Sequence, residues 1–325
     1  MSEPVLILGA NGRLGRALVT AFAEAGWTVL AQARRPLAYP LAGDVHTILT
    51  GIAETARLAA EAGGAGVVVH AMNAHYTRWA TEALPLAHSA IGIAKRLDAT
   101  LMFAGNVYNF GAPMPAVLRE DTPQRPSTRK GLIRVQTESL LREQSASGLR
   151  SIVIRAGDFY GGAGVGSWMD LAIAKDLAKA RIVYPGPLHS PHAWAYLPDL
   201  ARTFVAVARE RTRCAPFETL HFAGSTLTGR QMAEALTQAA KRAGILSPAQ
   251  TPAMRKFPWW ALRAGAWVVP MWRELLEMRY LWDEAHSLDE SKLTGLVGQV
   301  PRTPLDAAMD QTLADLRLGV RTPQR

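Results

Sequence analysis

The sequence predicts an α/β protein with a doubly wound parallel sheet, and three observations predict it. An apolar strand at 4–8 turns at Gly9 into an amphipathic helix from Arg13 to Ala25, and a second strand follows at 27–33. Continuous apolar, β-branched runs within 64–73, 98–111 and 149–162 are typical of strands buried on both faces. Helical stretches at 75–97 and 130–146 alternate with these runs, as expected when helices cover both faces of a parallel sheet.

Length and composition limit the protein to an ordinary globular class. The 325 residues, 49% hydrophobic and 19% charged, suit one large α/β domain or a core domain with a smaller partner. The net charge of +9 favours an anionic ligand. The Lys and Arg residues are scattered among acids without a basic tract, so we expect a small-molecule substrate and no nucleic acid.

Cysteine usage and the termini indicate a cytoplasmic protein. Cys214 is the single cysteine, which excludes an intrachain disulfide, and the N-terminal residues lack the pattern of a signal peptide. The apolar segment 257–282 is interrupted by prolines and charges, so we expect no stable membrane span. The histidines lack metal-ligand spacing, and we expect no metal.

The turn after the first strand carries the glycine pattern of a dinucleotide-binding loop. The glycines fall as Gly9-x-x-Gly12-x-x-Gly15, between a strand and a helix. Glycine permits the tight turn and the close approach of a pyrophosphate, and the helix N-terminus attracts the negative charge. We therefore expect the loop to bind the cofactor through the three glycines and the residues between them, Asn11, Arg13 and Leu14.

The end of the second strand favours NADP(H) over NAD(H). An acid for the ribose 2′-hydroxyl is absent from Gln32-Ala33-Arg34-Arg35, and Arg34 and Arg35 suit a 2′-phosphate instead. A solvated basic turn before Pro36 is the alternative. Asp44, taken to follow the third strand, is predicted either to contact the adenine or to act as a turn or capping acid.

Ligands of such sheets lie beyond the carboxyl ends of the strands, which directs attention to three segments. These are Ala71 to Asn73, Ala104 to Tyr108 and Ala156 to Tyr160. From them we expect cofactor contacts by Ala71, Met72, Asn73, Ala104, Ala156, Asp158 and Phe159. The glycine-rich segment 157–168 is either a mobile loop over the nicotinamide or a long connection.

These motifs together resemble the extended short-chain dehydrogenases/reductases, specifically the NAD-dependent epimerase/dehydratase family. Besides the glycine loop, the resemblance rests on "VVVHAMN", "FAGNVYNFG", "IVIRAGDFYGG", "HAWAYLPDLARTFVAVA" and the closing "SLDESKLTGLVGQVPRTPLDAAMDQTLADL". It implies a Rossmann-type sheet, formed by 1–156 with 193–225. It further implies a smaller, mainly helical substrate domain, formed by 157–192 with 226–325, and leaves a homodimer open.

The sequence departs from the family at the catalytic positions. Family members use a Ser beside a Tyr-x-x-x-Lys pair, whereas the corresponding residues are Ala104, Lys130 and Arg134, with Asn106 near enough to offer an amide. Lys130, Ile133, Arg134 and Glu138 also match the K-x-x-I-R-x-x-x-E helix of reductases related to isoflavone reductase, in which the Lys is the acid or base.

The spacing of this helix places Lys130, Arg134 and Glu138 on one face. Lys130 in the first turn, which Ser127 or Thr128 can cap, is expected to have a lowered pKa and to serve as general acid/base and cofactor ligand. Arg134 would hold the cofactor or a substrate anion, with Glu138 orienting it. The alternative is a solvated stripe of charges.

The leading hypothesis is an NADP(H)-dependent oxidoreductase that moves hydride to or from a small carbonyl, hydroxyl or activated double bond. Lys130, Arg134 and Asn106 carry its chemistry, and Tyr108 is a substitute proton donor or a packing residue. One alternative is a non-catalytic NADP(H)-binding sensor or scaffold. Another is a nucleotide-sugar epimerase/dehydratase with altered catalytic groups. The segment 257–282, with five of the nine tryptophans, is expected first to pack in the core and next to line a substrate cleft. An oligomer contact and a position on a membrane interface are further alternatives.

Overall fold

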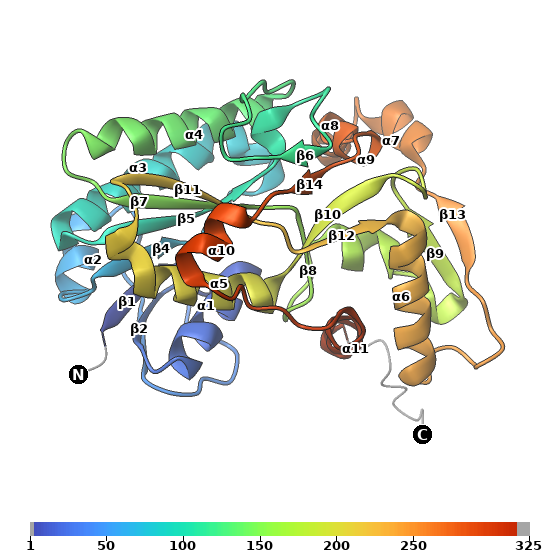
Figure 1. Cartoon of the computed structure of the whole chain (residues 1–325), viewed down its shortest axis with the longest axis horizontal. Coiled ribbons are helices and arrows are strands. Elements are labelled where there is room, and N and C mark those ends of the chain that lie inside the picture. The colour runs from blue at the N-terminus through green and yellow to red at the C-terminus, as the bar shows by residue number, and fades with distance from the viewer. Residues whose placement is uncertain (1–2, 317–325) are drawn as a thin grey trace.

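A seven-stranded parallel sheet forms the centre of the computed structural model, which describes residues 3–316 (Figure 1). The strand order is β11-β7-β5-β4-β1-β2-β3, and all six pairings are parallel. The strands are β1 (Pro4–Leu8), β2 (Thr28–Gln32), β3 (Val45–Ile48), β4 (Val67–His70), β5 (Thr100–Asn106), β7 (Ser151–Ala156) and β11 (Phe217–Phe222). The order reverses between β1 and β4, which opens a crevice at their carboxyl ends.

Helices cover both faces of this sheet, as the apolar runs predicted. One face packs on α1 (Arg13–Glu24) and α5 (Leu197–Glu210) through Val5, Ile7 and their neighbours. The other face packs on α2 (Thr55–Glu61), α3 (Trp79–Leu97) and α4 (Arg129–Ser145). Leu6 and Leu8 point to that side, so alternate residues of β1 are buried in different cores.

The C-terminal region, which lies to the right of the sheet in Figure 1, contains strands as well as the predicted helices. Its strands are β8 (Asp158–Tyr160), β9 (Arg181–Tyr184), β10 (Pro191–Tyr196), β12 (Ser225–Thr228) and β13 (Ala253–Lys256), in the sheets β12-β10-β8 and β13-β9. The helix α6 (Gly229–Arg242) packs on α11 (Leu305–Asp315). The predicted domain boundaries stay a prediction.

Part of the remaining C-terminal chain returns to the carboxyl edge of the central sheet. The elements of this remaining chain are α7 (Trp259–Gly265), α8 (Pro270–Glu277), α9 (Tyr280–Asp283), β14 (Ser287–Leu288), which pairs with β6 (Val117–Leu118), and α10 (Ser291–Val297). Met278 and Leu281 share an apolar cluster with Trp79, Val107 and Tyr108. This cluster fixes the C-terminal segment over the strand ends where the site residues were predicted.

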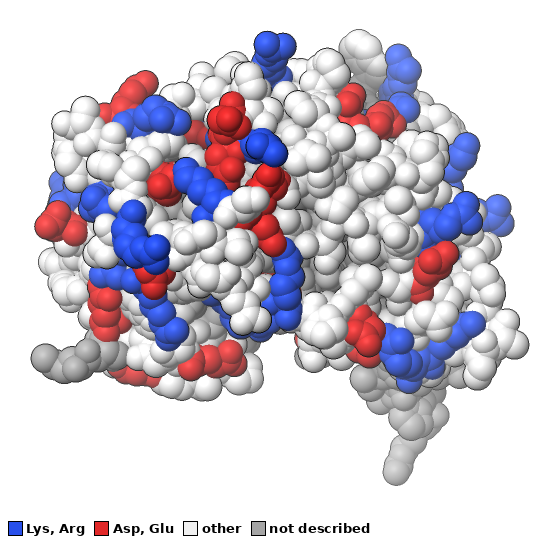
Figure 2. All heavy atoms as spheres, viewed as in Figure 1, with Lys and Arg blue, Asp and Glu red and all other residues white. Residues whose placement is uncertain are grey.

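The surface charge is mixed. On the face drawn in Figure 2, Lys and Arg are interspersed with Asp and Glu, so the net positive charge forms no continuous patch there. Within residues 3–316, no helix is long and apolar enough to cross a membrane.

Candidate active site

The glycine loop has the geometry that a dinucleotide-binding loop requires. Gly9 has a φ of +86°, and a Cβ added there would meet Cγ of Met72 at 2.8 Å. A Cβ on Gly15 would overlap the carbonyl oxygen of Gly9, so only glycine lets α1 start this close to β1. The first turn of α1 contains no acid and its N-terminus has no side-chain cap. Its backbone N–H groups are therefore available to an anion.

The basic turn is held beside this loop. Asn11 donates its amide to the carbonyl oxygen of Arg35 at 2.9 Å, so its side chain braces the turn. Tyr39 donates its hydroxyl to the carbonyl oxygen of Ala10 at 3.0 Å, and the Arg16 guanidinium lies over the Tyr39 ring. The side chains of Arg34 and Arg35 remain exposed at the end of β2.

Arg13 links the glycine loop to the segment that follows β8. It donates to the carbonyl oxygen of Gly161 at 2.9 Å, and Asp170 lies 3.9 Å away. Its Nε is buried without a partner in the described part of the chain. Burial lowers the pKa of Arg13 more than Asp170 raises it, so the charge is only partly compensated. The orphaned donor and the open helix N-terminus fit the pyrophosphate of a dinucleotide.

Asp44 was predicted to follow the third strand, and this placement is wrong. Asp44 precedes β3 and so lies at the amino edge of the sheet, opposite the crevice. It accepts hydrogen bonds from Thr28 at 2.6 Å and shares one with His46 at 2.7 Å, which is the turn role that was the alternative. The chain that leaves the carboxyl end of β3 is Thr50 to Ile52, which the sequence reasoning missed because β3 begins later than assumed.

The other predicted cofactor contacts lie at the carboxyl edge. Met72 covers Gly9, and Asn73 is exposed beyond β4. Ala104 lies in β5 opposite Ile154, and Ala156 ends β7. The remaining ones are Ala71 beside β4, Leu14 in α1, and Asp158 and Phe159 in β8. The edge thus brings most of the predicted residues together, while their contacts with a cofactor stay predictions.

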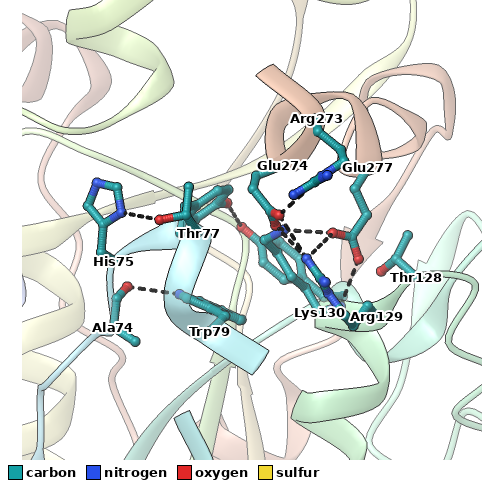
Figure 3. A network of polar contacts seen from close by, with 12 residues as sticks. Ala74, His75, Thr77, Trp79, Thr128, Arg129, Lys130, Arg273, Glu274 and Glu277 are labelled. Carbon is teal, nitrogen blue, oxygen red and sulfur yellow. Dashed lines mark hydrogen bonds and ion pairs between the residues drawn. The ribbon is translucent and has the colours of Figure 1, made fainter. Parts of the chain in front are cut away.

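Lys130 is not the free amine that the sequence suggested. Its side chain is 0% exposed and lies between Glu274 and Glu277 of α8 (Figure 3). Nζ donates to Glu274 and, at 2.6 Å, to Glu277, while the backbone N–H donates to Glu277 at 2.9 Å. Both carboxylates accept from the Lys130 ammonium, so its side chain is held inside an ion cluster. Thr128 caps the helix as expected, accepting from the Gly131 N–H at 3.1 Å.

Arg134 is enclosed by aromatic rings. Its guanidinium lies 4.7 Å from the centroid of Trp79 and 5.1 Å from that of Phe103, and no carboxylate of the described residues pairs with it. Its Nε and Nδ1 of His70 are both buried and find no partner within residues 3–316, and both residues line a cavity of about 20 Å³. Burial lowers the pKa of Arg134 and takes that of His70 to about 3, so His70 is neutral.

Glu138 does not orient Arg134, contrary to expectation. It forms a buried, two-point ion pair with Arg155 of β7, at 2.6 and 3.1 Å, and accepts from Gln124 at 2.9 Å. The predicted helix face therefore exists, but its three charged side chains have different partners. Lys130 contacts carboxylates of α8, Arg134 lies between aromatic rings, and Glu138 pairs with Arg155. None of the three is a member of a solvated stripe, because this face of α4 is turned toward the protein.

A pair of tyrosine hydroxyls occupies the end of β5. The hydroxyl oxygens of Tyr76 and Tyr108 are 3.0 Å apart, and the Lys130 ammonium lies 5.0 Å from the centroid of the Tyr76 ring. Burial raises the pKa of Tyr76 to about 12 and raises that of Tyr108 well above its ordinary value. Asn106 accepts from the Tyr108 N–H at 3.1 Å through Oδ1, which leaves its Nδ2 as the remaining donor.

Sequence reasoning missed a buried histidine cluster next to Asp158. His192 of β10 shares a hydrogen bond of 2.9 Å with Asp158 and stacks on Trp282, with centroids 4.4 Å apart. His286 lies beside His192, and burial takes its pKa to about 4. No spacing signal could reveal this cluster, because its members come from three distant segments. In residues 3–316, no group of three or more acidic, His or Cys side chains is arranged to hold a metal ion.

Comparisons with solved structures support the fold. The chain is similar to the enzyme WbmH of Bordetella bronchiseptica in complex with NAD⁺, at 18% identity and a TM-score of 0.73 over 98% of this chain and 99% of that chain. A putative epimerase from Burkholderia cenocepacia J2315 shares 17% identity at a TM-score of 0.75, covering 97% and 98% of the two chains. UDP-glucose 4-epimerase from Brucella ovis in complex with NAD shares 16% sequence identity at a TM-score of 0.72, over 98% of this chain and 99% of that chain.

The sequence itself also matches a family. No curated protein sequence matches the chain closely enough to indicate a relative. The family described as "NAD dependent epimerase/dehydratase family" matches residues 5–220, which include the whole glycine loop and all or most of each strand of the central sheet. With the parallel sheet, the open helix N-terminus and the residues gathered at its carboxyl edge, this match shows that the chain belongs to the NAD dependent epimerase/dehydratase family of enzymes.

Proposed function

We propose that the protein is an NADPH-dependent reductase of a small organic carbonyl or activated double bond. The observation that carries this proposal is the tyrosine pair at the end of β5, whose raised pKa values keep both hydroxyls protonated at neutral pH. A nicotinamide bound at this edge supplies the hydride. The residues of the chain then have to bind the cofactor, orient the substrate and provide a proton.

The cofactor preference rests on the turn after β2. Arg34 and Arg35 are exposed, have no acid partner among the described residues, and are braced beside the glycine loop by Asn11. A 2′-phosphate carries negative charge and several acceptor oxygens, which suits two guanidinium groups. The 2′-hydroxyl of NAD(H) would make no comparable interaction, because no carboxylate directly follows β2 to accept its hydrogen bond.

Tyr108 is the proposed proton donor, with Tyr76 as its partner. Burial raises the pKa of Tyr108 and makes its phenol a weak acid, but the alkoxide that forms when a carbonyl accepts hydride is a stronger base, so the transfer is favourable. The reverse reaction needs a phenolate, which burial disfavours. The structure of the pair therefore favours reduction over oxidation and over an epimerase cycle that begins with oxidation.

The predicted roles of Lys130, Arg134 and Asn106 change accordingly. Lys130, held by Glu277, lies against the Tyr76 ring, and we assign it a positioning role instead of proton exchange with substrate. Arg134 pairs with no carboxylate of residues 3–316, so we assign its guanidinium to an anionic group of the cofactor or substrate. Nδ2 of Asn106 remains free to donate to the carbonyl oxygen of the substrate.

Two titrations and one kinetic comparison test the proposal. NADPH and NADH are titrated by nicotinamide fluorescence into the wild type, Arg34→Ala/Arg35→Ala and a surface control, Arg57→Ala/Arg96→Ala. We expect the first variant to lose about tenfold to a hundredfold in NADPH affinity and the control to lose none. Equal affinity of the wild type for the two cofactors would contradict the NADPH preference.

The proton donor is tested by NADPH oxidation with a panel of aldehydes, ketones and enones. Tyr108→Phe is expected to lower kcat by about 10² to 10⁴ without weakening NADPH binding, and Tyr76→Phe is expected to have a smaller effect. Full turnover by Tyr108→Phe would exclude Tyr108 as the donor.

A non-catalytic NADP(H) sensor is the second candidate. The enclosure of Lys130 by Glu274 and Glu277 favours it, because the helix position that should carry the proton-transferring group is closed to a ligand. Discrimination between NADPH and NADP⁺, with no turnover of any compound in the panel or of UDP-glucose, would support the sensor and exclude the reductase.

A further inference from the structure

The hairpin formed by α7 and α8 exposes large apolar side chains at the edge of the molecule. Trp260 is 77% exposed, Trp267 is 96% exposed and Val268 is 83% exposed. The core-packing expectation for this tryptophan-rich segment holds for Trp282, which is buried, and is wrong for these two tryptophans. Figure 1 shows α7 at the upper right margin, beyond the sheets.

The exposed residues form one face. Trp260, Arg263 and Ala264 share one face of α7 at i, i+3 and i+4, Trp267 lies in the turn that follows the helix, and all four are exposed. The helix passes into a turn in which the Val268 and Val269 N–H groups both donate to the Gly265 carbonyl oxygen at 3.0 Å. A Cβ on Gly265 would overlap the ring of Trp272, so α7 and α8 are closely packed and present this face as a fixed tip.

The charges of the segment 253–279, which contains the tip, are arranged asymmetrically. Between 253 and 279 the chain has two acids, Glu274 and Glu277, and both point inward to Lys130 and Arg129 (Figure 3). Arg279 is paired with Asp283 at 3.5 Å. The other four charges of the segment are exposed cations, namely Arg255, Lys256, Arg263 and Arg273. Exposed charge contributed by this segment is therefore positive.

We propose that the α7–α8 tip docks on the surface of an anionic lipid bilayer. Tryptophan rings prefer the headgroup layer, where an apolar ring and a polar N–H are both accommodated. Each nearby cation strengthens attraction to an anionic surface by about fivefold. A projecting tip with inward-facing acids and outward-facing cations fits such a surface. A bilayer needs no complementary pocket to bind a convex tip, whereas a folded protein partner would. The tip lies on the interface and does not span it.

Vesicle co-sedimentation of the full chain tests the proposal. Vesicles of phosphatidylcholine alone are compared with vesicles that also contain phosphatidylglycerol, at low and at physiological salt. We expect salt-sensitive binding to the mixed vesicles only. Trp260→Ala/Trp267→Ala should lower the partition coefficient about tenfold or more, because both rings leave the headgroup layer. The fourfold change of Arg255, Lys256, Arg263 and Arg273 to Gln should lower it further.

Matched controls separate the tip from general surface properties. Leu41→Ala/Leu49→Ala removes exposed apolar side chains elsewhere, and a fourfold Gln variant at Arg57, Arg96, Lys179 and Arg230 removes equal charge from other surfaces. Both controls should bind like the wild type. Circular dichroism checks folding, which the substituted tip residues, being exposed, should leave intact.

Three results would overturn the proposal. The first is an absence of binding to mixed vesicles. The second is vesicle binding that the tryptophan variant leaves unchanged. The third is tip-dependent self-association in gel filtration without vesicle binding, which would make the tip a contact between two copies of this chain.

Discussion

Replacement of Lys130 by Met gives a sharp test of the ion cluster at the start of α4. Lys130 is 0% exposed and Glu274 is 2% exposed, so the substitution leaves buried carboxylates without their main partner. Removing one member of a buried pair typically costs about 3–5 kcal/mol. Arg129 still donates to both oxygens of Glu274, at 2.8 and 2.9 Å, so we expect the lower end, about 3 kcal/mol.

The assay is equilibrium unfolding in urea, with NADPH binding measured in parallel. The matched control is Arg273→Met, which removes an exposed guanidinium 4.0 Å from the same carboxylate and should cost about 0–1 kcal/mol. The triple variant Lys130→Met/Glu274→Gln/Glu277→Gln should recover most of the loss, since it removes the unpaired charges together. Unchanged stability of Lys130→Met combined with lost turnover would refute this reasoning and restore Lys130 as a reacting group.

Three further predictions concern pH and packing. His70, His221 and His286 have pKa values lowered by burial to about 3, 3 and 4, so the unfolded state binds more protons below pH 6.5. Stability should therefore fall as the pH falls from 7.5 to 5, each histidine contributing up to about 1.4 kcal/mol per pH unit, and a flat urea midpoint would contradict this. Burial raises the pKa of Glu274, but hydrogen bonds from Lys130 and Arg129 outweigh it and hold the pKa below 4.5. The stabilisation of the fold by ionised Glu274 is present at neutral pH and is lost on acidification below about pH 4.5. Glu274→Gln should therefore flatten the dependence of the unfolding free energy on pH in that range. Gly15→Ala should abolish NADPH binding and lower the melting temperature, because its Cβ overlaps the Gly9 carbonyl, whereas Gly295→Ala meets no atom within 4 Å and should retain binding.

The sequence by itself determined the features that depend on neighbouring residues. The glycine loop and α1 are where the apolar pattern placed them, with the helix ending at Glu24 and not Ala25. The strands predicted from β-branched runs lie in the central sheet, and Thr128 caps α4 as its side chain and position indicated. These predictions succeeded because strand burial, turn geometry and capping are set within one turn or one strand of chain.

The tertiary structure decided what the helix of 129–145 does. Its spacing predicted correctly that Lys130, Arg134 and Glu138 share a face, but spacing does not reveal which side chains that face meets. Lys130 meets carboxylates 144 and 147 positions later in the chain, and Glu138 meets Arg155 of a neighbouring strand. Asp44 was misplaced for a related reason, since the short β3, Val-His-Thr-Ile, has too weak a pattern to fix its start. Long-range partners determine whether a buried charge is a reacting group or a structural one, because its environment sets which protonation state is stable.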